Sequence, residues 1–284
     1  MRWEDRDGSE NLEDRRGQGG GGGGALKGGM GILLVGVITY FMSGGDLGKT
    51  FSVVMGEVAK NQTSVSTSTY QKTPHTEKQK RFVSVVLRDT EDVWSAIFAQ
   101  NGKRYPNPKL VLFSGATSSA CGKASMATGP FYCPADKKVY IDLGFFTELE
   151  NRHNAGGDFA RAYVIAHEVA HHVQNVMGTL QKVHNAKSTA TKIQSNRLQV
   201  KVELQADCYA GIWTHHADKT KNILEAGDIE EALNAASQIG DDTLQKKARG
   251  YVVPDSFTHG SSAQRMKWFK IGYETGSISQ CNTF

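Results

Sequence analysis

The stretch VIAHEVAHHVQ, residues 164–174, places three histidines and one glutamate in a segment that otherwise has the composition of a buried helix. The apolar run begins upstream, in AYVIA at residues 162–166, and continues through Val173 and Val176. A helix that is apolar on nearly every side lies in the core of a domain, and the polar groups that it carries there need partners. This helix is therefore expected at the centre of the fold, and the rest of the chain has to supply those partners.

His167, Glu168 and His171 form the pattern HExxH within this helix. Residues four apart lie on one helical face, so both imidazoles can reach one metal ion. Glu168 lies about 100° round the helix, where it can act on a water at that ion rather than bind the ion itself. His172 points about 140° away from His167 and is expected to be a neighbour, not a ligand.

A second pair of polar residues occurs in ELQAD, residues 203–207, on an apolar segment that continues as CYAGIW. A catalytic zinc takes three protein ligands and leaves a fourth position to water. One carboxylate of the pair can bind the metal while the other orients a ligand histidine through its second ring nitrogen. The best candidate for the third ligand is Glu203, and Asp207 is the main alternative. If the pair has no function, it is a solvent-facing acidic pair of the kind that is common on helices.

A related pattern, HExxHxxGxxH, would supply the third ligand from the first helix itself. It requires glycine and histidine at the positions where this chain has Gln174 and Met177. The third ligand must therefore come from elsewhere in the chain.

The segments around the central helix predict an α+β domain that is mainly helical with a small sheet, because few strands precede many helices. The central helix is expected to begin at Asp158 and to reach Met177. Further helices are expected over residues 76–99, 197–217, 228–247 and 261–274, and strands over residues 109–115 and 137–146. KKVYIDL, residues 137–143, is either an edge strand on which an extended peptide docks or a buried interior strand.

The first quarter of the chain differs from the rest. Residues 1–27 are rich in charge and glycine and are expected to be a disordered cytoplasmic tail. Residues 28–45 carry no charge and would span about 27 Å as a helix, which predicts a single transmembrane signal anchor. The alternatives are a core helix or part of a cleaved signal peptide. Residues 46–75 are expected to be a linker, followed by the domain over 76–284 on the exported side of the cell membrane.

Composition adds few constraints on function. The 284 residues are 39% apolar and 22% charged, as in an ordinary folded protein. The net charge of +4 is spread along the chain without a run of five or six like charges, so it indicates neither a nucleic-acid partner nor a polybasic membrane patch.

The four cysteines permit three pairings. Cys121 and Cys133 bracket a short loop, which favours their pairing and leaves Cys208 with Cys281. The alternative is four unpaired thiols in a reducing compartment.

HExxH followed by ExxAD resembles the glutamate-zincins, metallopeptidases whose third zinc ligand is a glutamate on a second helix. Four motifs in order are similar to those of the bacterial neutral zinc metallopeptidase family: GPFYCPADKKVYIDLGFF (129–146), VIAHEVAHHVQ (164–174), ELQADCYAGIW (203–213) and FTHGSSAQR (257–265). The resemblance implies a zincin-like fold with zinc held by His167, His171 and Glu203. It also implies that Glu168 is the catalytic base and that Asp207 orients His167.

Together, these features predict a membrane-anchored zinc metallopeptidase with a peptide or protein substrate. A zinc-stabilised binding domain without catalysis and a metallohydrolase acting on a non-peptide amide are the alternatives. His259, in a loop before the last helix, is expected either to donate a hydrogen bond to the oxyanion of the transition state or to form a structural turn. His215 and His216 are expected to be helix-end residues.

Overall fold

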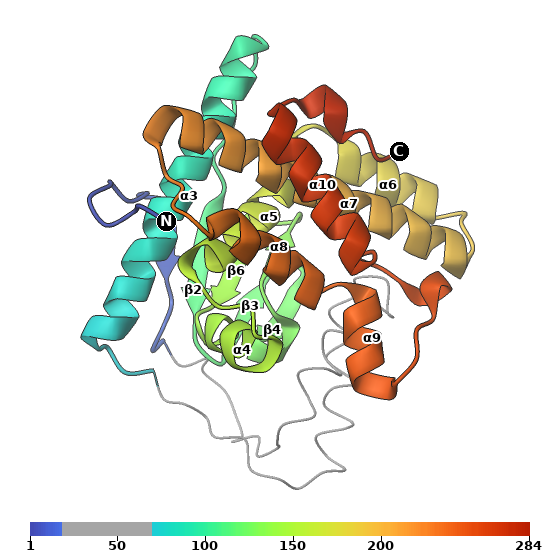
Figure 1. The fold of residues 1–284 in the computed structure, drawn as a ribbon, viewed down its shortest axis with the longest axis horizontal. Helices are drawn as coiled ribbons and strands as arrows, with labels where there is room; N and C mark the ends of the chain where they lie inside the picture. Colours follow the sequence, from blue (N-terminus) through green and yellow to red (C-terminus); the bar gives the residue numbers. More distant parts are fainter. Residues whose placement is uncertain (19–69) are drawn as a thin grey trace, which may run out of the picture.

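The computed structural model describes residues 1–18 and 70–284, which form a mainly helical body with a small sheet (Figure 1). The helices are α3 (Pro74–Gln100), α4 (Gly144–His153), α5 (Asp158–Val176), α6 (Thr179–Lys187), α7 (Lys192–Lys221), α8 (Asp228–Gln238), α9 (Asp241–Arg249) and α10 (Ser262–Thr275). The strands are β1 (Leu12–Asp14), β2 (Lys109–Phe113), β3 (Ala116–Ser119), β4 (Gly122–Ser125), β5 (Phe131–Cys133) and β6 (Lys138–Asp142). Three short 3₁₀ turns, Met126–Thr128, Pro254–Ser256 and Ile278–Cys281, complete the described elements. The α+β, mainly helical architecture expected from the sequence is thus the observed one.

The main sheet has the strand order β1-β2-β6-β5. The first three strands are parallel, and β5 pairs antiparallel with β6 at the edge, with Phe131 opposite Tyr140. The side chains of β6 alternate between two apolar clusters. Val139 and Ile141 face the large helical core, whereas Tyr140 faces a smaller cluster with Phe131. The segment 137–143 is therefore an interior strand, and β5 is the edge strand next to the helices.

Helix α5 lies at the centre of the fold, as its apolar sequence predicted. It packs against α3, α7 and α8 and against strands β5 and β6. Its start follows Gly157, whose φ of 109° favours glycine, and the chain turns again at Gly178 with a φ of 81°. The central position of α5 carries the HExxH residues into the interior of the domain.

The single helix expected over residues 228–247 is two helices, and this prediction was wrong. Helices α8 and α9 are separated at Ile239 and Gly240. The backbone of Gly240 lies directly against Ser262, and Asp241, the next residue, accepts hydrogen bonds from the loop before α10. Tertiary contacts therefore break a helical pattern that would otherwise continue.

Helices α7 and α10 run side by side (Figure 1) and approach most closely at two glycines. A Cβ on Gly211 would meet the backbone of Phe269 in α10, and a Cβ on Gly272 would meet the backbone of Cys208 in α7. Glycine is required at both positions because only hydrogen fits between the two backbones. This crossing places the start of α10 beside the ELQAD segment of α7.

Residues 1–18 are not a disordered tail, and this expectation is corrected. Trp3 is buried against Phe82, and its indole N–H donates to Asp158 at 2.9 Å. Ser9 donates to Glu91 at 2.6 Å, and β1 extends the sheet beside β2. The charges that suggested disorder find partners across the fold, so this segment belongs to the domain.

The membrane-anchor prediction is also corrected. None of the helices within residues 1–18 and 70–284 has the length and apolar character needed to cross a membrane. The span expected at residues 28–45 and most of the linker expected at 46–75 lie outside these residues. Residues 1–18 pack against the same body as residues 70–284, whereas the predicted topology placed them on opposite sides of a membrane. The expected location at the cell membrane, with the domain exported, is therefore not supported.

Candidate metal centre

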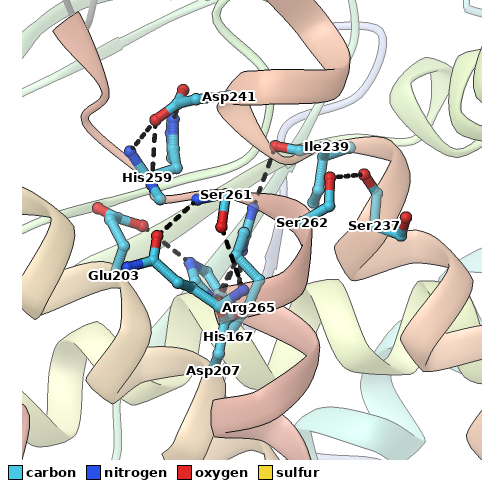
Figure 2. A network of polar contacts seen from close by, with 12 residues as sticks. His167, Glu203, Asp207, Ser237, Ile239, Asp241, His259, Ser261, Ser262 and Arg265 are labelled. Atoms are coloured by element: carbon cyan, nitrogen blue, oxygen red, sulfur yellow. Dashed lines mark hydrogen bonds and ion pairs between the residues drawn. The ribbon is translucent and has the colours of Figure 1, made fainter. Parts of the chain in front are cut away.

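Two neighbouring helices bring three metal-ligating side chains together. His167 and His171 project from α5 and Glu203 from α7, with one ligand atom of each within 4.8 Å of the others. The Oε2 atom of Glu203 lies 3.2 Å from Nε2 of His167 and 3.5 Å from Nε2 of His171. Figure 2 shows Glu203 and His167 facing one another. The geometry therefore groups the residues that the sequence could only place on two separate helices.

The donor set fits a zinc ion. Nδ1 of His167 lies 2.8 Å from an oxygen of Asp207, and Nδ1 of His171 lies 2.8 Å from Oε1 of Gln174. When Nδ1 donates to an oxygen, the neutral ring presents a lone pair at Nε2. Ligand atoms about 2.1 Å from zinc in a tetrahedron are about 3.4 Å apart, close to the separations observed between Glu203 and the two rings.

The local charge also favours a cation at this position. Burial lowers the pKa of His167, but the carboxylates of Asp207 and Glu203 outweigh burial and raise it to about 9. Burial raises the pKa of Glu203, yet the neighbouring His171 and His167 hold it well below its usual range. The buried carboxylate of Glu203 is therefore negatively charged, and it favours positive charge at the two imidazoles that it faces.

The structure separates the two carboxylates that the sequence left as alternatives. Glu203 belongs to the three-residue cluster, whereas Asp207 lies behind His167 and contacts its Nδ1. Asp207 is fully buried, and both of its oxygens accept hydrogen bonds from Arg265 at 2.8 and 2.9 Å. Burial raises the pKa of Asp207, but the charges of Arg265 and His167 outweigh burial and lower it to about 2.

Arg265 and Tyr163 belong to this site but were not among the residues predicted from the sequence. Arg265 is only 2% exposed, and besides Asp207 it donates to the Tyr163 hydroxyl and to the carbonyl oxygen of Ile239. Tyr163 donates to Asp207 at 2.5 Å. One signal for Arg265 was available, because Ser262, Arg265, Phe269 and Gly272 follow helical spacing and form the buried face of α10.

Glu168 lies in the same pocket as the three grouped side chains but is not one of them. It is 9% exposed, and burial raises the pKa of its carboxyl group. The pocket has a volume of about 450 Å³. Its lining includes Phe131 and Tyr132 of the edge strand and apolar side chains from several helices and from the break between α8 and α9, namely Phe145, Val164, Leu180, Val183, Ile239 and Leu244.

His259 lies in a structural turn that also lines this pocket. One oxygen of Asp241 accepts the backbone N–H groups of Thr258, His259 and Gly260 at 2.7, 2.6 and 3.0 Å. The other oxygen lies 3.1 Å from Nδ1 of His259. Figure 2 shows this turn beside Glu203. The structural turn, one of the two alternatives expected for His259, is therefore present, and donation to an oxyanion stays a prediction.

The other histidines singled out in the sequence lie outside the cluster. His172 contacts the Tyr132 hydroxyl through Nδ1 at 3.0 Å and the carbonyl oxygen of Pro106 through Nε2 at 2.7 Å. It therefore ties the edge strand β5 to the HExxH helix. His215 and His216 contact the carbonyl oxygens of Tyr273 and Gly276 near the end of α10.

The structure contains two disulfides. Cys121 pairs with Cys133 and Cys208 pairs with Cys281, the pairing that the sequence favoured. The second disulfide joins Cys281, in the 3₁₀ turn Ile278–Cys281, to Cys208 of α7, which lies five residues after Glu203.

Comparison with known proteins gives one family and several relatives. A family model described as "Putative neutral zinc metallopeptidase" matches residues 1–284. "Uncharacterized protein YpfJ" of Escherichia coli (strain K12) is 47% identical over 292 aligned residues, which cover 100% of this chain and 99% of that protein. "Uncharacterized protein Rv2575" of Mycobacterium tuberculosis (strain H37Rv) is 41% identical over 214 residues, covering 72% of this chain and 71% of that protein. No solved structure matches the chain.

Proposed function

The chain belongs to the neutral zinc metallopeptidase family, and from this premise we propose that it hydrolyses peptide bonds at the site formed by His167, His171 and Glu203. The observation that carries the proposal is that the Glu168 carboxylate shares a pocket with three converging metal-ligating side chains. A metal held only for stability would not need a base beside it.

The proposed roles follow from where each side chain lies. His167, His171 and Glu203 would hold a zinc ion, which would supply a Lewis acid for a carbonyl oxygen and would lower the pKa of water toward 7. Glu168 accepts a proton from the attacking water and delivers it to the nitrogen of the leaving amine. Burial raises the pKa of Glu168, which makes its carboxylate a better proton acceptor. His259 donates a hydrogen bond to the oxygen that becomes negative in the transition state.

Asp207 and Arg265 act on the reaction indirectly. Asp207 accepts the Nδ1 proton of His167 and so fixes which nitrogen faces the metal. Arg265 holds Asp207 through two parallel hydrogen bonds and keeps it ionised inside the core. Both residues are positioning residues because neither belongs to the three-ligand cluster.

We propose an extended peptide as the substrate. Strand β5 lies at the edge of the sheet, and among the described residues no further strand pairs with it. Phe131 and Tyr132 of this strand line the pocket, so a peptide that pairs with β5 would pass beside Glu168. The apolar lining of the pocket suits apolar substrate side chains, and its volume of about 450 Å³ is sufficient for them.

The test compares the parent with Glu168→Gln on a mixed peptide library. Gln has nearly the shape of Glu and the substitution removes no ligand, so zinc content and thermal midpoint should stay the same. Cleavage should fall by a factor of about 10² to 10⁴ because the base is lost. Glu203→Ala should lose zinc and cleavage together.

Glu150→Gln, at an exposed glutamate of α4, is the matched control and should cleave like the parent. Undiminished cleavage by Glu168→Gln would remove Glu168 from the mechanism. A parent that binds zinc but cleaves no peptide would favour a non-catalytic zinc domain or a hydrolase of another amide.

A further inference from the structure

The Nδ1 atom of His171 contacts an amide whose orientation is fixed by the backbone. Gln174 lies three residues later on α5, is fully buried, and places Oε1 2.8 Å from Nδ1 of His171. Its Nε2 lies 2.8 Å from the carbonyl oxygen of Val202 in α7. A backbone carbonyl can only accept, so the nitrogen of this amide must face Val202. Oε1 therefore faces His171, and the proton of the neutral ring must lie on Nδ1.

A second amide extends this arrangement to the C-terminal segment. Nε2 of Gln174 also donates to Oε1 of Gln205 at 3.0 Å, and Nε2 of Gln205 donates to the carbonyl oxygen of Cys281 at 3.1 Å. Because Cys281 again offers only an acceptor, the orientation of Gln205 is determined as well. Cys281 is joined to Cys208 of α7 by a disulfide, so this carbonyl is held close to the metal centre.

We propose that Gln174 and Gln205 are positioning residues that set the tautomer and ring orientation of His171, with the disulfide-linked C-terminal segment as their anchor. The two histidines of the site are then controlled differently. His167 donates to a carboxylate that Arg265 holds, whereas His171 donates to a neutral amide held by the carbonyl oxygen of Val202 and by the side chain of Gln205. The inference rests on the proposed zinc site, because its consequence is a lone pair at Nε2 directed toward that site.

The test measures zinc affinity by competition with a chromogenic chelator. Gln174→Met keeps the approximate volume but removes the acceptor for His171, so the zinc dissociation constant should rise about 10- to 100-fold. Gln205→Met removes one of the two acceptors that hold the Gln174 amide and leaves the Val202 carbonyl in place, so a smaller rise in the same direction should result. Gln205→Met also keeps the test available if Gln174→Met does not fold.

The matched control is Gln245→Met. Gln245 of α9 is also a buried amide with two hydrogen bonds, one to Ser256 and one from the N–H of Val253. Its loss should lower the thermal midpoint of the metal-free protein without changing the zinc dissociation constant. This control separates a general loss of a buried amide from a specific effect on the ligand.

A second readout follows the ring nitrogens directly. In the metal-free parent, at a pH at which the ring is neutral, ¹⁵N spectra of labelled histidine should show the proton of His171 on Nδ1, and Gln174→Met should redistribute it between the two ring nitrogens. Equal zinc affinity in the parent, Gln174→Met and Gln205→Met would overturn the inference while leaving the zinc site intact. An equal loss of affinity in Gln245→Met would also overturn it. A parent without zinc affinity would instead refute the proposed function, and the inference with it.

Discussion

At the scale of single residues, the positions of the metal-site side chains depend on two kinds of geometry, the spacing along one helix and the packing between two helices. His167, Glu168 and His171 could be assigned because four-residue spacing fixes one helical face. Glu203 and Asp207 share a face of α7 in the same way, so only the packing of α7 against α5 distinguishes the residue in the cluster from the residue behind His167.

Arg265 and Gln174 were not predicted for the same reason. The carboxylate that Arg265 contacts lies 58 residues earlier in the chain, and the carbonyl that Gln174 contacts lies 28 residues later. A single sequence carries no record of such distant pairs. Burial of a charged or amide side chain on an apolar helical face is the physical signal that remains.

Arg265→Lys should destabilise the protein although it keeps the charge. A lysine ammonium cannot make the two parallel hydrogen bonds to Asp207 and also reach Tyr163 and Ile239, so buried acceptors are left unpaired. The free energy of unfolding should fall by about 2 kcal/mol, as measured by urea denaturation of the metal-free protein. Arg197→Lys, in an exposed pair with Asp255, is the control and should change it by less than about 0.5 kcal/mol. Equal stability of Arg265→Lys and the parent would show that the two parallel hydrogen bonds from the guanidinium group to Asp207 are not needed for stability.

At the scale of elements, periodicity predicted the existence of the helices better than their ends. Helix α7 begins at Lys192, earlier than expected, because Thr191 and Gln194 form a capping box whose T-x-x-Q pattern is present in the sequence. The break between α8 and α9 has a tertiary cause, since Asp241 binds the turn that carries His259. Strand β6 could not be assigned to the edge or the interior, because its neighbours β2 and β5 lie on both sides of it only in the folded sheet.

The crossing of α7 and α10 supports a prediction at this scale. In Gly272→Ala the added methyl group would meet the backbone of Cys208, which cannot move aside as a flexible side chain can. The helices must separate, so the free energy of unfolding should fall by about 2 kcal/mol, despite the better helix propensity of alanine. Gly211→Ala should behave alike from the other helix. Lys270→Ala, on the exposed face of α10, is the control. A more stable Gly272→Ala would mean that the helix propensity of alanine outweighs the close approach of the α7 and α10 backbones.

At the scale of the whole molecule, the domain is larger than composition indicated. The prediction placed its start near residue 75, after a linker, and excluded residues 1–27 because they combine high charge with glycine. In the structure Arg6 forms an ion pair with the buried Asp89, and Ser9 and Asn11 both donate to Glu91. The N-terminal segment thus supplies partners for the acidic side chains of α3. Composition counts charges but cannot show which of them pair, and paired charges can be buried.

Trp3 offers the sharpest test of this enlarged domain. Its ring packs edge-on against Phe82 at 5.2 Å, and its indole N–H donates to Asp158, the first residue of the helix that carries HExxH. Trp3→Ala in the full chain removes both contacts and leaves a cavity, so the free energy of unfolding should fall by about 3 kcal/mol. The thermal midpoint should drop by roughly 6–12 °C in a domain of this size.

Tyr251→Ala, at a tyrosine that is 61% exposed, controls for the loss of an aromatic side chain and should melt within a few degrees of the parent. If Trp3→Ala melts like the parent, residues 1–18 contribute nothing to stability and the domain boundary near residue 75 is correct after all. If it melts lower, the N-terminal segment is part of the cooperative unit that holds the start of α5, and with it the metal-ligating histidines, in place.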